Sequence, residues 1–164
     1  MCAALTTLGY NTYHGFRAIA DHRDFALWHP AYLTIFTSRP SPAVLRIDCA
    51  FFDQVIGHID AVTDVPCISF WQELIEAYPD AKIVLVQRDE DAWFRSFDEV
   101  FIAFRENSLN FWIQYLDPIK AGGLAKCINL ILKYDYGSED PETLRRTARQ
   151  TCRKHYAAVR QRIK

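Results

Sequence analysis

Residues 82–96 read KIVLVQRDEDAWFRS, and this stretch decides the fold class of the 164-residue chain. The run 82–87 is nearly continuous in apolar residues and has the length of a strand, which is typical of a parallel strand covered on both faces. Arg88 follows the run. The acids at 89–91 then supply the cap and the first-turn charges of a helix that we expect to extend to about Glu106.

Upstream of this stretch, the hydrophobic periodicity predicts helices that alternate with short strands. The predicted helices cover residues 1–8, 21–36, 49–59 and 68–78, and the predicted strands cover residues 10–13 and 60–63. Gly9 should stop the first helix, and Pro30 should kink or divide the second. Residues 38–42, with two prolines and two serines, should form a loop.

Downstream, residues 107–134 should be mostly helical, with breaks near Pro118 and at 122–123, where two glycines adjoin. The final helix should begin after Ser138, with Pro141 in its first turn. A helix, a buried parallel strand and a helix in this order predict a helix-rich α/β protein. Because 50% of the residues are hydrophobic, the chain can build one sizeable core. We therefore expect a single domain over residues 1–164.

Composition limits the partners and the location of the protein. No stretch reaches the roughly 18 apolar residues of a membrane span, and the first residues lack the basic region of a signal peptide. The formal net charge of −1 gives no general attraction to nucleic acid. The five cysteines form no CxxC pair, and the histidines lack metal-binding spacing. We expect a cytoplasmic protein without metal, nucleic acid or membrane as a partner.

Basic residues gather at the end of the chain. Residues 145–164 contain eight lysines and arginines and no acid. One interpretation is a face that binds an anion. The other is the solvated side of an amphipathic helix, since apolar residues keep helical spacing on another face.

A phosphate site can be predicted at the end of the run 82–87. Ligands of open α/β sheets bind beyond the carboxyl ends of the strands. Arg88 stands at such an end and Ser96 follows eight residues later, so an arginine fork and a hydroxyl could bind one phosphate. In the alternative interpretation, Arg88 pairs with one of the acids at 89–91 and Ser96 is an ordinary helix residue.

The residues from 61 to 96 also carry a specific motif. It reads A-V-x-D-x-P, then E-L-x-x-x-Y-P-x-A-K, then a strand ending in R-D-x-x-x-W-x-x-S. The matching residues are Ala61, Val62, Asp64, Pro66, Glu73, Leu74, Tyr78, Pro79, Ala81, Lys82, Arg88, Asp89, Trp93 and Ser96. The motif resembles the central signature of a P-loop sulfotransferase family that is abundant in fungi and often mislabelled as NAD-dependent epimerase or dehydratase. Weaker similarity covers most of the chain.

The resemblance implies a P-loop NTPase-like, three-layer sulfotransferase fold with a short parallel sheet. In this class, the arginine and serine at the positions of Arg88 and Ser96 bind the 3′-phosphate of 3′-phosphoadenylyl sulfate (PAPS). Asp64 stands where the cytosolic enzymes place a catalytic histidine, which implies a general base; the alternative is that Asp64 caps the helix near Cys67. His14 resembles the histidine of a Tyr-His pair and would line the acceptor pocket, or else be a partly buried histidine with satisfied hydrogen bonds.

Two parts of the family pattern are absent from these 164 residues. Members open with a strand and a loop resembling G-x-x-R-T-G-T-x-S, which holds the 5′-phosphosulfate, and they close with a G-W-E-P-L-C type segment. We therefore expect a sulfotransferase truncated at both ends, without its first strand and P-loop. Whether the chain by itself is an enzyme stays open.

Two functions remain as alternatives. The first is that the full-length parent transfers a sulfuryl group from PAPS to a hydroxyl of a small-molecule acceptor. The second is a catalytically inactive truncated paralogue that binds a nucleotide weakly or acts through protein contacts. A sheet without its first strand would expose unpaired edges, through which the chain could form a homo-oligomer. The absence of a GxGxxG fingerprint disfavours an NAD-dependent epimerase.

Overall fold

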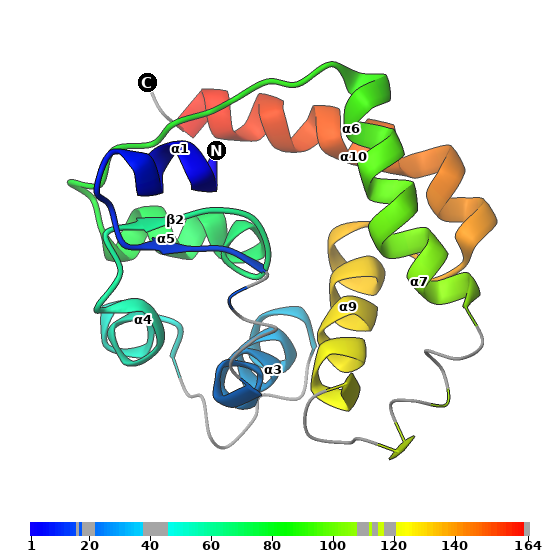
Figure 1. The fold of residues 1–164 in the computed structure, drawn as a ribbon, viewed down its shortest axis with the longest axis horizontal. Helices are drawn as coiled ribbons and strands as arrows, with labels where there is room; N and C mark the ends of the chain where they lie inside the picture. Colours follow the sequence, from blue (N-terminus) through cyan, green and yellow to red (C-terminus); the bar gives the residue numbers. More distant parts are fainter. Residues whose placement is uncertain are drawn as a thin grey trace. The chain divides into compact units, whose positions relative to one another are not determined.

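The structure of the chain, a computed structural model, describes residues 1–15, 17, 22–37, 46–107, 112, 115–116 and 121–162. The chain separates into two compact units, unit 1 (Met1–Ala81) and unit 2 (Lys82–Lys164), which can be followed along the colours of Figure 1. Each unit is described by itself. The predicted loop at 38–42 and the predicted break near Pro118 lie outside the described residues.

Unit 1 alternates helices with two short strands, as the periodicity predicts. Its elements are α1 (Cys2–Thr7), β1 (Thr12–Tyr13), α3 (His22–Phe36), α4 (Cys49–Ile56), β2 (Ala61–Val62), the 3₁₀-helix η1 (Cys67–Phe70) and α5 (Trp71–Ala77). Gly9, just beyond α1, has a φ of 91° in the left-handed region that favours glycine. The prediction that Gly9 follows the first helix is therefore confirmed.

The sequence predicts that Pro30 kinks or divides the second helix. The helix α3 continues through Pro30, so the predicted division is wrong. Proline removes one helical hydrogen bond. Trp28, which precedes this proline, and Ala31 and Tyr32, which follow it, are fully buried. Most helical stability in proteins comes from such packing, which here outweighs the lost hydrogen bond.

The two strands of unit 1 pair in parallel. Thr12 lies opposite Ala61 and Tyr13 opposite Val62, and the main-chain N–H of Thr63 donates to the carbonyl of Tyr13 at 2.9 Å. Parallel strands end at the same edge of a sheet, so the residues that follow β1 and β2 are neighbours. This pairing positions the first candidate site.

Aromatic rings fill the core of unit 1 around Trp28. The indole is fully buried, and its Nε1–H donates to the Tyr13 hydroxyl at 3.0 Å. Its ring neighbours, at centroid distances from 5.2 to 6.5 Å, are Tyr13, Phe51, Phe52 and Phe70. Because these rings come from β1, α4 and η1, the core fixes the strand β1 against the helices.

Unit 2 is helical throughout its described elements. They are α6 (Glu90–Phe97), the π-helical turn η2 (Asp98–Ile102), α7 (Ala103–Glu106), α9 (Ala121–Asp135) and α10 (Pro141–Arg162). The carboxylate of Asp89 accepts the N–H of Ala92 at 2.9 Å and caps α6, which confirms the predicted cap. Pro141 begins α10, also as predicted.

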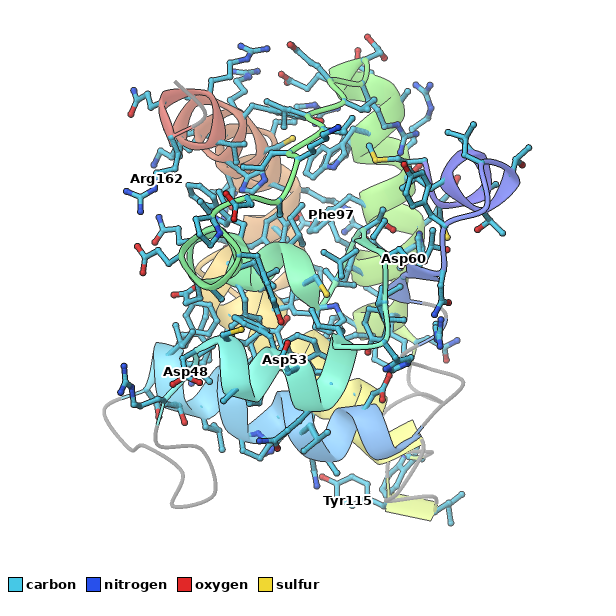
Figure 2. All side chains as sticks on the ribbon, turned by 90° about the vertical axis from the view of Figure 1, so that its left-hand side faces the viewer. Asp48, Asp53, Asp60, Phe97, Tyr115 and Arg162 are labelled. Atoms are coloured by element: carbon cyan, nitrogen blue, oxygen red, sulfur yellow. The ribbon has the colours of Figure 1, made fainter. Side chains whose placement is uncertain are left out.

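The predicted break at residues 122–123 is wrong, because both glycines lie within α9. A glycine costs a helix interior only about 1 kcal/mol relative to alanine. Burial on the same helix offsets that cost: Ile128 and Leu132 pack with Phe97, Ile102 and other residues in the core of unit 2. Phe97, labelled in Figure 2, is 4% exposed.

The run 82–87 is not the buried strand that we predicted. It has no regular secondary structure, and Ile83, Val84 and Val86 are 40%, 65% and 48% exposed. An apolar run becomes a strand only where a neighbouring chain supplies partners for its N–H and C=O groups. Among the described residues, the run has no main-chain partner of this kind; the Val86 carbonyl instead accepts the hydroxyl of Tyr156 at 3.0 Å.

No helix in the described part of the chain has both the length and the apolar character needed to cross a membrane.

Candidate functional site

The first candidate site lies in unit 1, where β1 and β2 end. His14 follows β1 directly and Asp64 follows β2 by two residues. The Nδ1 atom of His14 lies 3.4 Å from an Oδ atom of Asp64, and the two side chains are 29% and 43% exposed. The structure therefore brings together the predicted general base and the residue predicted to line the acceptor pocket.

A tight backbone turn directs the Asp64 carboxylate towards His14. Asp64 has a φ of 64°, in the left-handed region that few residues other than glycine adopt. A β-carbon at Gly15 would lie 2.8 Å from Asp64 Oδ2 and 3.1 Å from the carbonyl of Val65. A larger residue here would have to push the Asp64 carboxylate aside, so Gly15 is part of the geometry of the site.

The Asp64 side chain does not serve as the helix cap of the alternative interpretation. The cap position of η1 is Pro66, without a side-chain cap bond. The main-chain carbonyl of Asp64 accepts the N–H of Ile68 at 2.9 Å, which leaves the carboxylate beside the imidazole of His14. A carboxylate and an imidazole side by side can accept and hold a proton.

The thiol of Cys67 lies close in sequence to this pair but is not suited to be a nucleophile. It is 2% exposed. Burial, with a smaller contribution from the charge of Asp64, raises the pKa of the thiol well above its usual value. The thiol therefore stays protonated, whereas a nucleophilic cysteine needs the thiolate.

The second candidate site lies in unit 2 and contains the predicted phosphate-binding residues. The guanidinium of Arg88 donates from Nη2 to Ser96 Oγ at 3.4 Å and to the carbonyl of Ala92 at 3.5 Å. Both distances are long for such bonds, so the donors of Arg88 are only weakly engaged. The structure thus places Arg88 and Ser96 together, as their spacing predicts.

The three acids that follow Arg88 do not pair with it. Asp89 is occupied as the cap of α6, where it accepts the N–H of Ala92. Glu90 and Asp91 form ion pairs with arginines of α10. Within the described ranges, Arg88 has no carboxylate partner. The alternative interpretation, in which one of these acids neutralises the arginine, is therefore not what the structure shows.

Two arginines of α10 hold these acids. Arg153 donates to both oxygens of Glu90, at 2.7 and 2.6 Å. Arg149 donates to Asp91 at 3.0 Å and lies 3.7 Å above the centre of the Phe94 ring. The hydrogen bond from Arg153 is the main cause that holds the pKa of Glu90 below its usual value.

A third arginine of α10 binds acids further along the chain. Arg145 contacts Asp98 at 3.2 Å, Glu106 at 2.7 Å and Glu142 at 3.2 Å. Its hydrogen bonds hold the pKa of Glu106 below the usual value. Much of the basic face at the end of the chain is thus used within unit 2, which neither interpretation of the sequence had anticipated.

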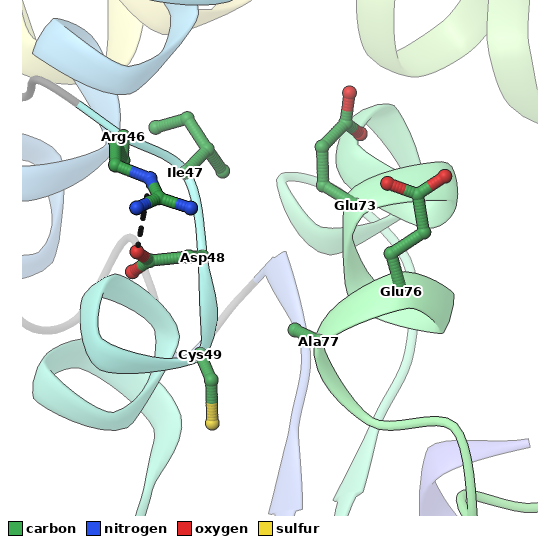
Figure 3. Close-up of a pocket in the computed structure, with 7 residues that line it drawn as sticks. All are labelled: Arg46, Ile47, Asp48, Cys49, Glu73, Glu76 and Ala77. Carbon is green, nitrogen blue, oxygen red and sulfur yellow. Dashed lines mark ion pairs between the residues drawn. The ribbon is translucent and has the colours of Figure 1, made fainter.

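A separate hollow of about 510 Å³ opens in unit 1 (Figure 3). Its lining comes from the segment that leads into α4, from the first residue of α4 and from α5, and consists of Arg46, Ile47, Asp48, Cys49, Glu73, Glu76 and Ala77. Arg46 pairs with Asp48 at 3.6 Å. Glu73 belongs to the sequence motif, but the sequence gives no other sign of this hollow, and none of the predicted site residues lines it.

The close approach at Gly15 predicts the effect of a single methyl group. In Gly15→Ala, the new β-carbon would displace the Asp64 carboxylate and press on the Val65 carbonyl, so the free energy of unfolding should fall by about 1 kcal/mol, the low end for overpacking. The NMR signals of the His14 imidazole should move as well. Gly9→Ala is the control for the NMR signals alone: no atom lies within 4 Å of a β-carbon there, so the His14 signals should stay in place, although the φ of 91° at Gly9 makes alanine unfavourable for stability. Unchanged His14 signals in Gly15→Ala would contradict the geometry.

Comparison with known proteins identifies the family. The model of the sulfotransferase domain matches residues 1–164. One relative, Ava biosynthesis cluster protein M of Aspergillus versicolor, is 35% identical over 96 residues, which are 58% of this chain and 35% of the relative. The matched part therefore spans about a third of the length of that protein. Since the family match extends over the entire chain, the chain belongs to the sulfotransferase domain family, as its central motif predicts.

Proposed function

We propose that this chain is the part of a sulfotransferase that binds the 3′-phosphate of PAPS and deprotonates a hydroxyl of a small-molecule acceptor. Membership of the sulfotransferase domain family supports sulfuryl transfer. PAPS as the donor, a hydroxyl compound as the acceptor and a P-loop NTPase-like architecture for the whole protein are parts of the proposal. None of the roles assigned below requires a metal ion.

The observation that carries the proposal is that the guanidinium of Arg88 lies beside a hydroxyl and is not neutralised by an acid among the described residues. Its guanidinium lies beside Ser96 Oγ at 3.4 Å and has no carboxylate partner in the described part of the chain. A guanidinium can donate two parallel hydrogen bonds to a phosphate, and the hydroxyl of Ser96 can add a third. Arg88 also stands just before α6, whose N-terminal dipole favours a negative charge.

Asp64 supplies the second half of the proposed chemistry. Its carboxylate would accept the proton of the acceptor hydroxyl while the acceptor oxygen bonds to sulfur. The bond from sulfur to the phosphate oxygen then breaks, and adenosine 3′,5′-bisphosphate leaves. His14, 3.4 Å from Asp64, would line the acceptor side. Both side chains are partly exposed, so a substrate hydroxyl can approach them.

The phosphate site is tested by the binding of adenosine 3′,5′-bisphosphate to the chain, measured by calorimetry. Hydrogen bonds to charged groups contribute about 1.5–3 kcal/mol, so Arg88→Ala should weaken binding roughly 10- to 100-fold. Ser96→Ala should weaken it less. Arg146→Ala removes one positive charge from α10, at a residue that donates to the Thr143 hydroxyl at 3.4 Å, and should leave the affinity unchanged. Equal affinity in Arg88→Ala and Arg146→Ala would refute the site.

The role of Asp64 is tested on the sulfotransferase reaction of the whole protein, with labelled PAPS and a panel of small alcohols and phenols. A general base contributes about 100- to 10,000-fold, so Asp64→Asn should lower kcat by that factor. Its affinity for adenosine 3′,5′-bisphosphate should not change, because other residues bind the phosphate. A variant with normal kcat would exclude Asp64 as the base.

A second candidate function is association with another copy of the chain. The exposed side chains of Ile83, Val84 and Val86 favour it, as does the main chain of the run 82–87, which forms no backbone ladder with the described residues, because such segments pair with other strands. Sedimentation velocity should then show association that rises with protein concentration and is lost in Val84→Lys. Val100→Lys changes a comparably exposed valine of η2, at 54%, and should not matter. A monomer at all concentrations would exclude this function.

A further inference from the structure

The geometry of α10 points to an additional role for two of its arginines, which rests on the phosphate site proposed at Arg88. We propose that Arg149 and Arg153 are positioning residues for that site. By binding Asp91 and Glu90, they keep both carboxylates away from Arg88 and leave its guanidinium available to an anion.

The need for such positioning arises from the sequence next to Arg88. Three acids occupy the next three positions, 89–91. A carboxylate and a phosphate compete for the same fork of a guanidinium, since both accept its paired hydrogen bonds. An acid tethered two or three residues away is present at a high effective concentration. Unless these acids are bound elsewhere, they would therefore compete with a phosphate for Arg88.

The contacts of α10 bind the two acids that do not cap α6. Arg153 makes two parallel hydrogen bonds to Glu90, at 2.7 and 2.6 Å. Arg149 lies 3.0 Å from Asp91 and 3.7 Å from Glu90, so it bridges the two carboxylates. A bidentate pair and a bridge form a network, which is more effective than isolated surface ion pairs.

The same face of α10 also fixes the main chain that leads into Arg88. The Tyr156 hydroxyl donates to the Val86 carbonyl at 3.0 Å, and the guanidinium of Arg160 donates to the side-chain carbonyl of Gln87. Steps of four, three and four residues place 149, 153, 156 and 160 on one stripe of the helix. This stripe thus contacts residues on both sides of Arg88, at 86–87 and at 90–91.

Arg145 provides a built-in comparison. It lies one turn before Arg149 on α10 and is also bound to carboxylates, but these are Asp98, Glu106 and Glu142. Replacement of Arg145 would remove ion pairs from the same helix but would leave Glu90 and Asp91, the acids beside Arg88, bound to Arg149 and Arg153. The comparison separates a positioning effect on the anion site from a general loss of helix contacts.

The inference is tested by the affinity of the chain for adenosine 3′,5′-bisphosphate in three multiple variants. Arg149→Ala with Arg153→Ala releases both acids and should weaken binding about tenfold. Adding Glu90→Gln and Asp91→Asn should restore the affinity to within about twofold, because neutral amides compete poorly for a guanidinium. Loss of binding that these amides fail to restore would mean a merely structural role and would overturn the inference.

The control pair, Arg145→Ala with Arg146→Ala, removes the same charge from α10 and should leave the affinity near that of the unchanged chain. A loss as large as that of the first pair would trace the effect to net charge and would overturn the inference. An unchanged affinity after loss of Arg149 and Arg153 would overturn it as well.

A measurement without ligand separates this inference from the proposed function. The NMR signal of the Arg88 side-chain Nε–H should shift when Arg149 and Arg153 are replaced, because the released acids approach Arg88. It should return when the two amides are added. A signal that does not shift overturns the inference, whatever the nucleotide does. If the signal behaves as expected but the unchanged chain binds no nucleotide, the phosphate site at Arg88 fails and the role of α10 in holding the acids stands.

Discussion

Arginine–carboxylate pairing along one face of α10 is the interaction on which the distribution of charge in unit 2 depends. Arg145, Arg149 and Arg153 bind acids from α6, η2 and α7. Exposed ion pairs contribute little energy one by one, whereas networks with bidentate geometry contribute more. Their larger effect here is to determine which charged side chains of the described residues remain without a partner of opposite charge. After Glu90 and Asp91 are bound, the guanidinium of Arg88 keeps only long hydrogen bonds.

In unit 1, the constraint is one of space and not of charge. The parallel pairing of β1 with β2 brings the residues after them to one edge. Gly15 lets the turn at Asp64 approach closely enough for the carboxylate to reach His14. The left-handed backbone of Asp64 is a conformation that surrounding contacts must hold in place, and such residues are common at functional sites.

The sequence predicts those features that depend on near neighbours. Asp89 as a cap, Gly9 beyond α1 and the approach of Ser96 to Arg88 all follow from spacing along a helix. What it could not predict depends on distant partners. The run 82–87 needs a neighbouring strand, and its hydrophobicity does not say whether one is there. The arginines of α10 meet acids 58 and 63 residues earlier, a pairing that composition cannot reveal.

The π-helical turn η2 has a consequence for helical phase. A regular helix turns by about 100° per residue, and a π turn contains one residue more than an α turn, so everything beyond it is set back by about one position. Glu106 then lies where the residue seven places after Asp98 would lie in a regular helix, two turns further on the same side. This offset lets a single guanidinium, that of Arg145, reach carboxylates eight positions apart. The irregular turn η2 thus keeps the acids of α6, η2 and α7, which follow one another without a break from Glu90 to Glu106, aligned with the basic side of α10.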